Sequence, residues 1–175
     1  GIPLRYVDRV IGVTKAYETR VGNGPMPTEL NDEVGARLQS VGGEVGTTTA
    51  RIRRCGWLDL VLLKYAVQVA GITELAVTKL DILDDFDEIK VCIVYYNPDE
   101  TPFIGEVENL SSSELGKMVS VYATLPGWKS STRGVRKWDD LHQNAQNYLR
   151  VIEHFVRLPI SIISVGPNDE DTILV

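Results

Sequence analysis

Residues 57 to 81 read WLDLVLLKYAVQVAGITELAVTKLD, and this stretch predicts a helix that runs directly into a strand. Its first half repeats apolar residues at the spacing of a largely buried helix, which begins at Gly56-Trp57 and ends at Gly71. A short apolar strand from Leu75 to Thr78 follows. Polar side chains come next at Thr78-Lys79-Leu80-Asp81, where the strand ends.

Signals for helices and strands also alternate over the rest of the chain. Helix signals occur at Asn31-Asp32-Glu33, with a stop at Gly42-Gly43, and from Leu141 to Val156 at clear amphipathic spacing. Further strands are predicted at residues 9–20, 88–96, 119–122 and 159–165. Strands alternating with helices predict an α/β fold, with a layered, mostly parallel or mixed sheet flanked by helices. Ligands bind such sheets at the carboxyl ends of the strands.

Composition narrows the class of protein. The chain has 175 residues, 43% of them apolar, which is enough for one domain with a buried core. A net charge of −6 argues against a nucleic-acid partner, and no apolar run approaches the ~20 residues of a membrane span. Two cysteines are too few for a disulfide framework, so a reducing cytoplasmic location is expected. The chain opens on Gly1 and both ends read as strand, which predicts a fragment of a longer protein.

The stretch from Gly46 to Asp59 reads GTTTARIRRCGWLD and places three hydroxyls before three arginines. Hydroxyls, backbone amides and guanidinium forks all bind carboxylates or phosphates. A helix beginning at Gly56-Trp57 would add the positive end of its dipole. We expect this loop to hold a small, multiply anionic molecule. The alternative is a solvated loop whose arginines pair with acidic neighbours.

Two short motifs follow strands and could line a flat base. The Asp81 carboxylate can accept hydrogen bonds from the ring N–H and the exocyclic amine of guanine, a donor pair that adenine lacks. The Lys79 stem can cover the face of the base, as in the Asn/Thr-Lys-x-Asp motif of small GTPases, which Thr78-Lys79-Leu80-Asp81 resembles. The alternative is a surface ion pair worth about 0–1 kcal/mol. Ser164-Val165-Gly166-Pro167 offers a hydroxyl and backbone amides, or is an ordinary turn.

Other residues with reactive side chains have simpler interpretations. His142 and His154 lack partners at metal-ligand spacing and are expected to be solvent-facing or structural. The acidic run from Asp81 to Glu88 lacks the glycine and spacing of an EF-hand, so no metal site is predicted. Cys55 has basic neighbours that could lower its pKa, but no base follows to use it, and a structural role is expected.

Five blocks in this order are similar to the carboxyl-terminal portion of adenylosuccinate synthetases, and the resemblance covers nearly the whole chain. The blocks are KAYETRVG with GPMPTEL (15–22 and 24–30), GTTTARIRRCGWLD (46–59), TKLDILD (78–84), LPGW (125–128) and IISVGP (162–167). Two positions depart from the pattern. Ala50 stands where the family commonly has glycine, which could stiffen the loop if φ is positive there, and Ile52 replaces a usual basic residue.

The resemblance implies an activity. Enzymes of this family are Mg²⁺-dependent and homodimeric; they phosphorylate the 6-oxygen of IMP with GTP, after which L-aspartate displaces phosphate to give adenylosuccinate. By resemblance, the aspartate- and IMP-binding residues are Val21, Thr47, Thr48, Thr49, Ala50, Arg51, Ile52 and Arg53. The GTP-binding residues are Arg53, Lys79, Leu80, Asp81, Ser164, Val165 and Gly166.

The catalytic groups of the family are not recognisable here. No glycine-rich phosphate loop is present and the histidines are misplaced, although electrostatic stabilisation of the phosphoryl group dominates such catalysis. We therefore expect the 175-residue piece alone to be inactive and the Mg²⁺ ligands to lie outside it. Two alternatives are a stand-alone guanine-nucleotide or anion-binding module without catalysis, and an α/β structural domain whose loop binds nothing specific.

Overall fold

The structure, a computed structural model, describes residues 6–46 and 50–175. Strands and helices alternate along most of the chain. In order they are β1 (Ile11–Lys15), β2 (Glu18–Arg20), α1 (Glu33–Val41), β3 (Arg54–Gly56), β4 (Leu58–Asp59), α2 (Leu60–Ala70), β5 (Glu74–Thr78), the 3-10 turn η2 (Leu80–Leu83), β6 (Glu88–Tyr96), η3 (Val107–Asn109), α3 (Ser112–Leu115), β7 (Val119–Pro126), η4 (Trp138–Asp140), α4 (Gln143–Val156), β8 (Ile160–Ser164), η5 (Asp169–Asp171) and β9 (Thr172–Leu174). The predicted α/β class is confirmed.

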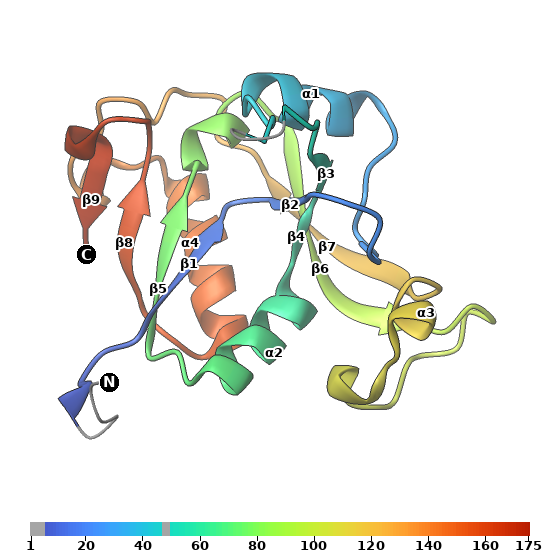
Figure 1. The fold of residues 1–175 in the computed structure, drawn as a ribbon. Helices are drawn as coiled ribbons and strands as arrows, with labels where there is room; N and C mark the ends of the chain where they lie inside the picture. Colours follow the sequence, from blue (N-terminus) through green and yellow to red (C-terminus); the bar gives the residue numbers. More distant parts are fainter. Residues whose placement is uncertain (1–5, 47–49) are drawn as a thin grey trace.

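The largest sheet has the strand order β1-β5-β8-β9. Strands β1, β5 and β8 are parallel, and β9 is antiparallel to β8. Lys15 lies opposite Thr78, and Val77 lies opposite Ile163, so the three parallel strands end at one edge. Figure 1 shows β5 and β8 pointing toward the end of the molecule where α1 lies. Crossovers between parallel strands bring residues far apart in sequence to this edge.

Two smaller sheets complete the layers. Strand β4 pairs in parallel with β6, which pairs antiparallel with β7, while β2 and β3 form a separate antiparallel ribbon. The sheets therefore combine parallel and antiparallel pairs, which agrees with the predicted mostly parallel or mixed sheet. The core includes Leu75 and Val77 of β5, Leu149 and Ile152 of α4, and Ile163 of β8, all fully buried.

Local signals explain the helix boundaries. The Asp32 side chain caps α1 by accepting from the Gly35 N–H, as the helix start at 31–33 predicted. The Asp59 carboxylate accepts from the Val61 and Leu62 N–H groups and so begins α2, which ends at Gly71 in the left-handed conformation. Helix α4 turns its apolar face to the core, as its spacing predicted. None of the described helices is both long and apolar enough to cross a bilayer.

Two predicted boundaries are wrong. The helix expected to begin at Gly56-Trp57 begins at Leu60, because Leu58 and Asp59 pair with Val91 and Cys92 of β6. The strand predicted over residues 9–20 is split at Ala16 and Tyr17. There the chain leaves the large sheet and continues as β2, which pairs with β3. Both errors arise from strand pairings between segments distant in sequence, which a local hydrophobic pattern does not contain.

Candidate functional site

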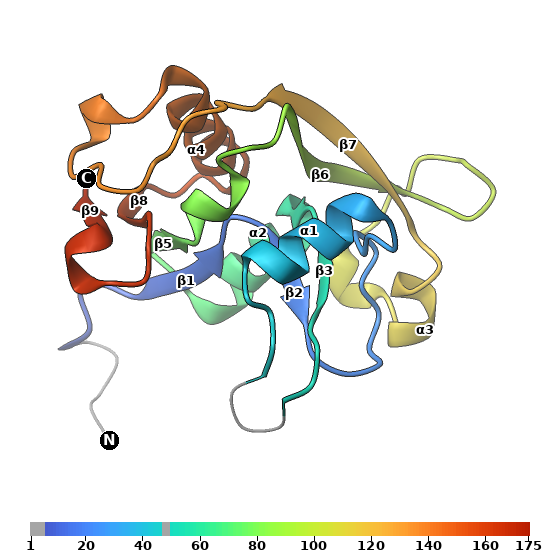
Figure 2. The same cartoon turned by 90° about the horizontal axis from the view of Figure 1, so that it is seen from above.

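Three predicted site segments emerge at the same edge of the large sheet. Lys15 is the last residue of β1, Lys79 follows the end of β5, and Ser164 is the last residue of β8. Figure 2 views the molecule from this end and shows η2 between α1 and the β8–β9 connection. The carboxyl edge of an α/β sheet is the usual place for a ligand. The fold therefore brings the two base-lining motifs onto neighbouring strands.

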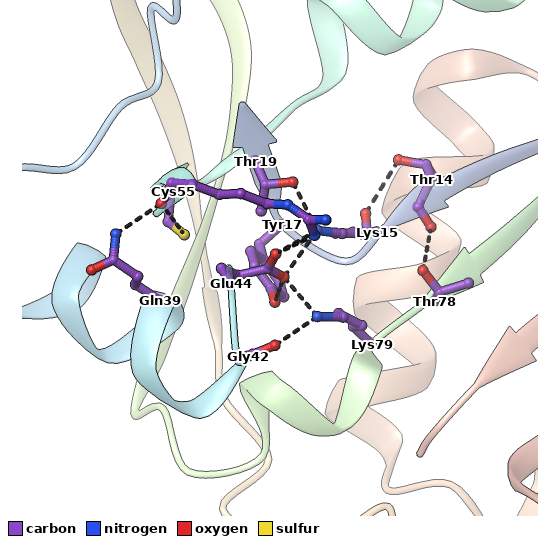
Figure 3. Close-up of polar contacts among 11 residues, drawn as sticks. Thr14, Lys15, Tyr17, Thr19, Gln39, Gly42, Glu44, Cys55, Thr78 and Lys79 are labelled. Carbon is purple, nitrogen blue, oxygen red and sulfur yellow. Dashed lines mark hydrogen bonds and ion pairs between the residues drawn. The ribbon is translucent and has the colours of Figure 1, made fainter. Parts of the chain in front are cut away.

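The polar centre of this edge is the Glu44 carboxylate, which is fully buried (Figure 3). Lys15 Nζ lies 2.9 and 2.8 Å from its two oxygens, Lys79 Nζ lies 2.7 Å from Oε1, and Arg53 Nη1 lies 2.9 Å from Oε2. The Tyr17 hydroxyl also donates to Oε1. Three cations thus surround one carboxylate, and their excess positive charge favours an anion at this edge.

These contacts determine the protonation state of Glu44. Burial alone would raise its pKa, but hydrogen bonds from Lys15, Lys79, Tyr17 and Arg53 lower the pKa of Glu44 to about 2. Burial lowers the pKa of Lys15, an effect that the Glu44 contacts oppose. The cluster therefore holds an ionised carboxylate throughout the neutral range.

Glu44 also forms the base of the predicted anion loop. The Arg53 N–H donates to the Glu44 carbonyl at 2.9 Å, and the Gly46 N–H donates to the Arg51 carbonyl at 2.8 Å. Arg53 is consequently held by its backbone and its guanidinium to the same residue. The predicted hydroxyls Thr47, Thr48 and Thr49 lie outside the described residues. The expected helix dipole at the end of this loop is wrong, because the loop leads into β3 and not into a helix.

The other residues near the loop have different environments. Arg51 and Ile52 are exposed, with Ile52 in an isolated bridge to Val45. Val21 is also exposed and follows directly after β2. The third arginine of the stretch, Arg54, faces away from Glu44: its guanidinium pairs with Glu29 and donates to the Gly22 and Gly24 carbonyls. Arg54, which the predicted site of residues 47–53 does not include, thus holds the turn after β2.

The Lys79-Leu80-Asp81 segment forms a tight corner after β5. Lys79 has φ of 59°, in the left-handed region, and its ammonium donates to the Gly42 carbonyl at 2.7 Å as well as to Glu44. Leu80 is fully buried in the core, so only its backbone is available to a ligand. The Asp81 side chain is 5% exposed and pairs with Arg133 at 3.2 Å. The corner thus places one cation and one carboxylate two positions apart at the end of β5.

The β8 loop lies beside this corner. The Ser164 hydroxyl donates to the Gly166 carbonyl at 2.9 Å, and Val165 is fully buried, leaving its backbone as the accessible part. A side chain at position 166 would place its Cβ 2.4 Å from the Asp171 carboxylate, so any residue but glycine would displace the Asp171 side chain. The Asp171 carbonyl accepts from the Val165 N–H at 2.8 Å. Asp171 therefore holds this loop in shape.

Sequence reasoning missed several residues of this edge: Lys15, Tyr17, Glu44 and Arg133. A glutamate beside Gly42-Gly43 carries no motif of its own, and its partners come from positions 15, 17, 53 and 79. One usable signal exists, since a buried charge must be paired and Glu44 is adjacent to the anion loop. That signal identifies neither the partners nor their number.

Ala50 has φ of 51°, so this position does adopt the left-handed conformation that favours glycine. We expect Ala50→Gly to raise the free energy of unfolding by about 0.5–1 kcal/mol, since relief of left-handed strain outweighs the greater entropy of unfolded glycine. Urea unfolding measures this change. Ala36→Gly is the matched control on the exposed side of α1 and should lower stability by about 1 kcal/mol. Equal losses in both variants would contradict the assigned strain.

The remaining candidates are structural. Burial and the Glu44 charge raise the pKa of Cys55 to about 11 despite its basic neighbours, and both cysteines are buried and free. His142 caps α4 by accepting from the Asn144 N–H, and His154 is exposed. Across residues 6–46 and 50–175, no group of three His, Cys, Asp or Glu side chains could hold a metal ion. No step through a metal is assigned to these residues.

Comparisons with known proteins place this geometry in a family. The adenylosuccinate synthetase family model matches residues 1–173. Adenylosuccinate synthetases of Gloeobacter violaceus and Schizosaccharomyces pombe are 49% and 48% identical to the chain, over 100% and 99% of its length. A fully ligated adenylosuccinate synthetase structure from Plasmodium falciparum superposes over 100% of the chain with a TM-score of 0.95 and 38% identity. The chain spans only 39% of those two relatives and 42% of the solved chain. The chain belongs to the adenylosuccinate synthetase family.

Proposed function

We propose that this chain is the carboxyl-terminal, guanine- and aspartate-binding part of an enzyme that joins IMP and L-aspartate with GTP hydrolysis to form adenylosuccinate, GDP and phosphate. One observation carries the proposal. Asp81 follows β5 and Ser164 ends the adjacent parallel strand β8, while the Lys79 ammonium reaches the carboxylate that also holds Arg53. This supports a base-reading role for the corner after β5 and an anion-binding role for the segment of Arg53 at the same edge.

The guanine part of the proposal rests on hydrogen-bonding chemistry. A carboxylate that is 5% exposed needs donors, and the guanine N1–H and 2-amino groups supply two on one edge of the base. Adenine presents an unprotonated N1 there and so cannot offer Asp81 this pair of donors. The Lys79 stem and the Ser164–Gly166 backbone provide surfaces on either side of the base.

The aspartate part rests on charge. L-aspartate carries two carboxylates, and guanidinium groups bind carboxylates bidentately. Arg51 is exposed at the start of the segment that Arg53 anchors to Glu44, so Arg51 is available to a substrate. Arg53 keeps further donors beyond the one given to Glu44. We assign Arg51, with Thr47, Thr48 and Thr49, to the carboxylates, and Arg53 to the region between aspartate and GTP.

Binding and turnover test this function separately. The protein in its natural length should bind GDP in preference to ADP and form adenylosuccinate from IMP, aspartate and GTP, measured by calorimetry and chromatography. The 175-residue chain alone should give no turnover, since its described residues provide no phosphoryl-transfer site. Turnover by the isolated chain would contradict the proposal. Equal GDP and ADP affinity in the natural-length protein would contradict the guanine assignment.

Other properties of the whole enzyme are carried by the family resemblance. They are Mg²⁺ as the metal that accompanies GTP, with ligands elsewhere in the enzyme, and a homodimeric state. A cytoplasmic location agrees with the two free, buried cysteines, because oxidising compartments favour disulfides. Val21 is assigned to the IMP ribose on the same basis.

A further inference from the structure

The Asp81 carboxylate has a partner in this structure, the guanidinium of Arg133. Arg133 Nη2 and Nε both donate to Asp81 Oδ2, at 3.2 and 3.3 Å. The two side chains differ sharply in exposure, with 5% of Asp81 and 65% of Arg133 accessible. The pair lies in a cavity of about 290 Å³ that is also lined by Val41, Asp84, Asp85 and Ser131. One member of the pair is thus fixed and buried, and the other reaches in from solvent.

A guanidinium and the edge of guanine present the same chemistry to a carboxylate. Each offers two N–H donors side by side on a planar, conjugated group. Arg133 therefore makes with Asp81 the kind of contact that the N1–H and 2-amino groups of guanine would make. A guanine edge that pairs with both oxygens of Asp81 would need Oδ2, the oxygen that both Arg133 donors occupy.

The loop that carries Arg133 is anchored by hydrogen bonds before and after this residue. Asp84 accepts from Trp128 Nε1 and from the Thr132 N–H, both at 2.8 Å. Arg136 Nη2 donates to Asp171 at 3.1 Å, next to the β8 loop. These anchors hold the backbone around Arg133, while its largely exposed side chain remains free to turn into solvent. Loss of the Asp81 contact therefore requires no change in the loop backbone.

We propose that Arg133 competes with the guanine base for Asp81 and so determines the affinity for guanine nucleotides. This inference rests on the proposed function, in which Asp81 reads the base. Without nucleotide, Arg133 keeps a buried carboxylate paired, which would otherwise be costly. When guanine arrives, its two donors replace those of Arg133, and the guanidinium moves into water. The Arg133 side of the ion pair with Asp81 is exposed to solvent, so loss of this pair should change the affinity for guanine nucleotides only modestly.

The test is GDP binding by calorimetry to the natural-length protein and its Arg133→Ala variant. We expect Arg133→Ala to bind GDP about three- to tenfold more tightly, with ADP affinity unchanged. Removing a cation ordinarily weakens the binding of a polyphosphate, so the expected sign is opposite to that of a purely electrostatic or structural role. Lys129→Ala is the matched control on the same loop. Its ammonium pairs with Asp87 at 2.9 Å, so its loss should not tighten binding.

Repeating the measurement in an Asp81→Asn protein distinguishes failure of the competition from failure of the proposed function. In an Asp81→Asn protein the competition is removed, and adding Arg133→Ala should have no further tightening effect. If Arg133→Ala leaves GDP affinity equal or weaker while Asp81→Asn loses guanine preference, the competition is overturned and the proposed function stands. If Asp81→Asn retains full guanine preference, Asp81 does not read the base, and both proposals fall.

Discussion

Asp81→Asn is expected to weaken GDP binding by about 30- to 150-fold and to remove the preference for GDP over ADP. The change replaces a carboxylate that accepts two hydrogen bonds by an amide that can accept only one and turns a donor toward the base. Hydrogen bonds to charged groups contribute about 1.5–3 kcal/mol, and the expected loss of affinity corresponds to about 2–3 kcal/mol. The Asp81 side chain is 5% exposed, so water does not compensate for the lost acceptor.

Xanthosine diphosphate gives a rescue that a damaged fold would not show. Xanthine carries a carbonyl in place of the 2-amino group, and the side-chain amide introduced by Asp81→Asn can donate to that carbonyl while accepting from a ring N–H. Asp81→Asn should therefore bind the xanthine nucleotide more tightly than the unaltered protein does. Asp85→Asn is the matched control, because the Asp85 side chain is 82% exposed on the same turn. Guanine preference that survives Asp81→Asn would contradict the assignment.

Glu44→Gln is expected to lower the free energy of unfolding at pH 7 by about 3–5 kcal/mol, the cost of removing one partner from a buried ionic cluster. The substitution leaves Lys15, Arg53 and Lys79 close together without their shared carboxylate. Their repulsion should also loosen the attachment of the anion loop to the corner after β5. Urea unfolding measures the loss. Glu29→Gln is the control, since Glu29 pairs with a single arginine and is 22% exposed, and its effect should be smaller.

The same cluster predicts the acid stability of the protein. The folded-state pKa of Glu44 is about 2, below its ordinary value of 4.5. Its contribution, about 3 kcal/mol, is therefore complete above pH 5 and is lost as the pH falls from 4.5 toward 2. In Glu44→Gln this part of the acid dependence should disappear. An unchanged slope of unfolding free energy between pH 5 and pH 3 in the variant would contradict the assigned ionisation.

Local features of the chain predicted most of the secondary structure. The cap at Asp32, the stop at Gly71 and the apolar spacing of α4 each depend on residues within a few positions of one another, and such short-range signals are readable directly. The start of α2 was misplaced because Leu58 and Asp59 pair with β6, thirty-three residues along the chain. A pairing over that distance leaves no local mark.

The sequence by itself determined the α/β class, and it predicted the carboxyl edge of the sheet as the place of the site and the motif that contains Lys79 and Asp81. It also marked Ala50 as unfavourable if φ is positive there, and the structure supplied that φ, 51°. Only the tertiary structure decided which charges face one another. Glu44 gathers Lys15, Arg53 and Lys79, and Arg133 takes Asp81, because parallel strands and their connections bring these segments to one edge. Side-chain type follows from sequence alone, whereas the partner of a charge depends on how distant segments pack.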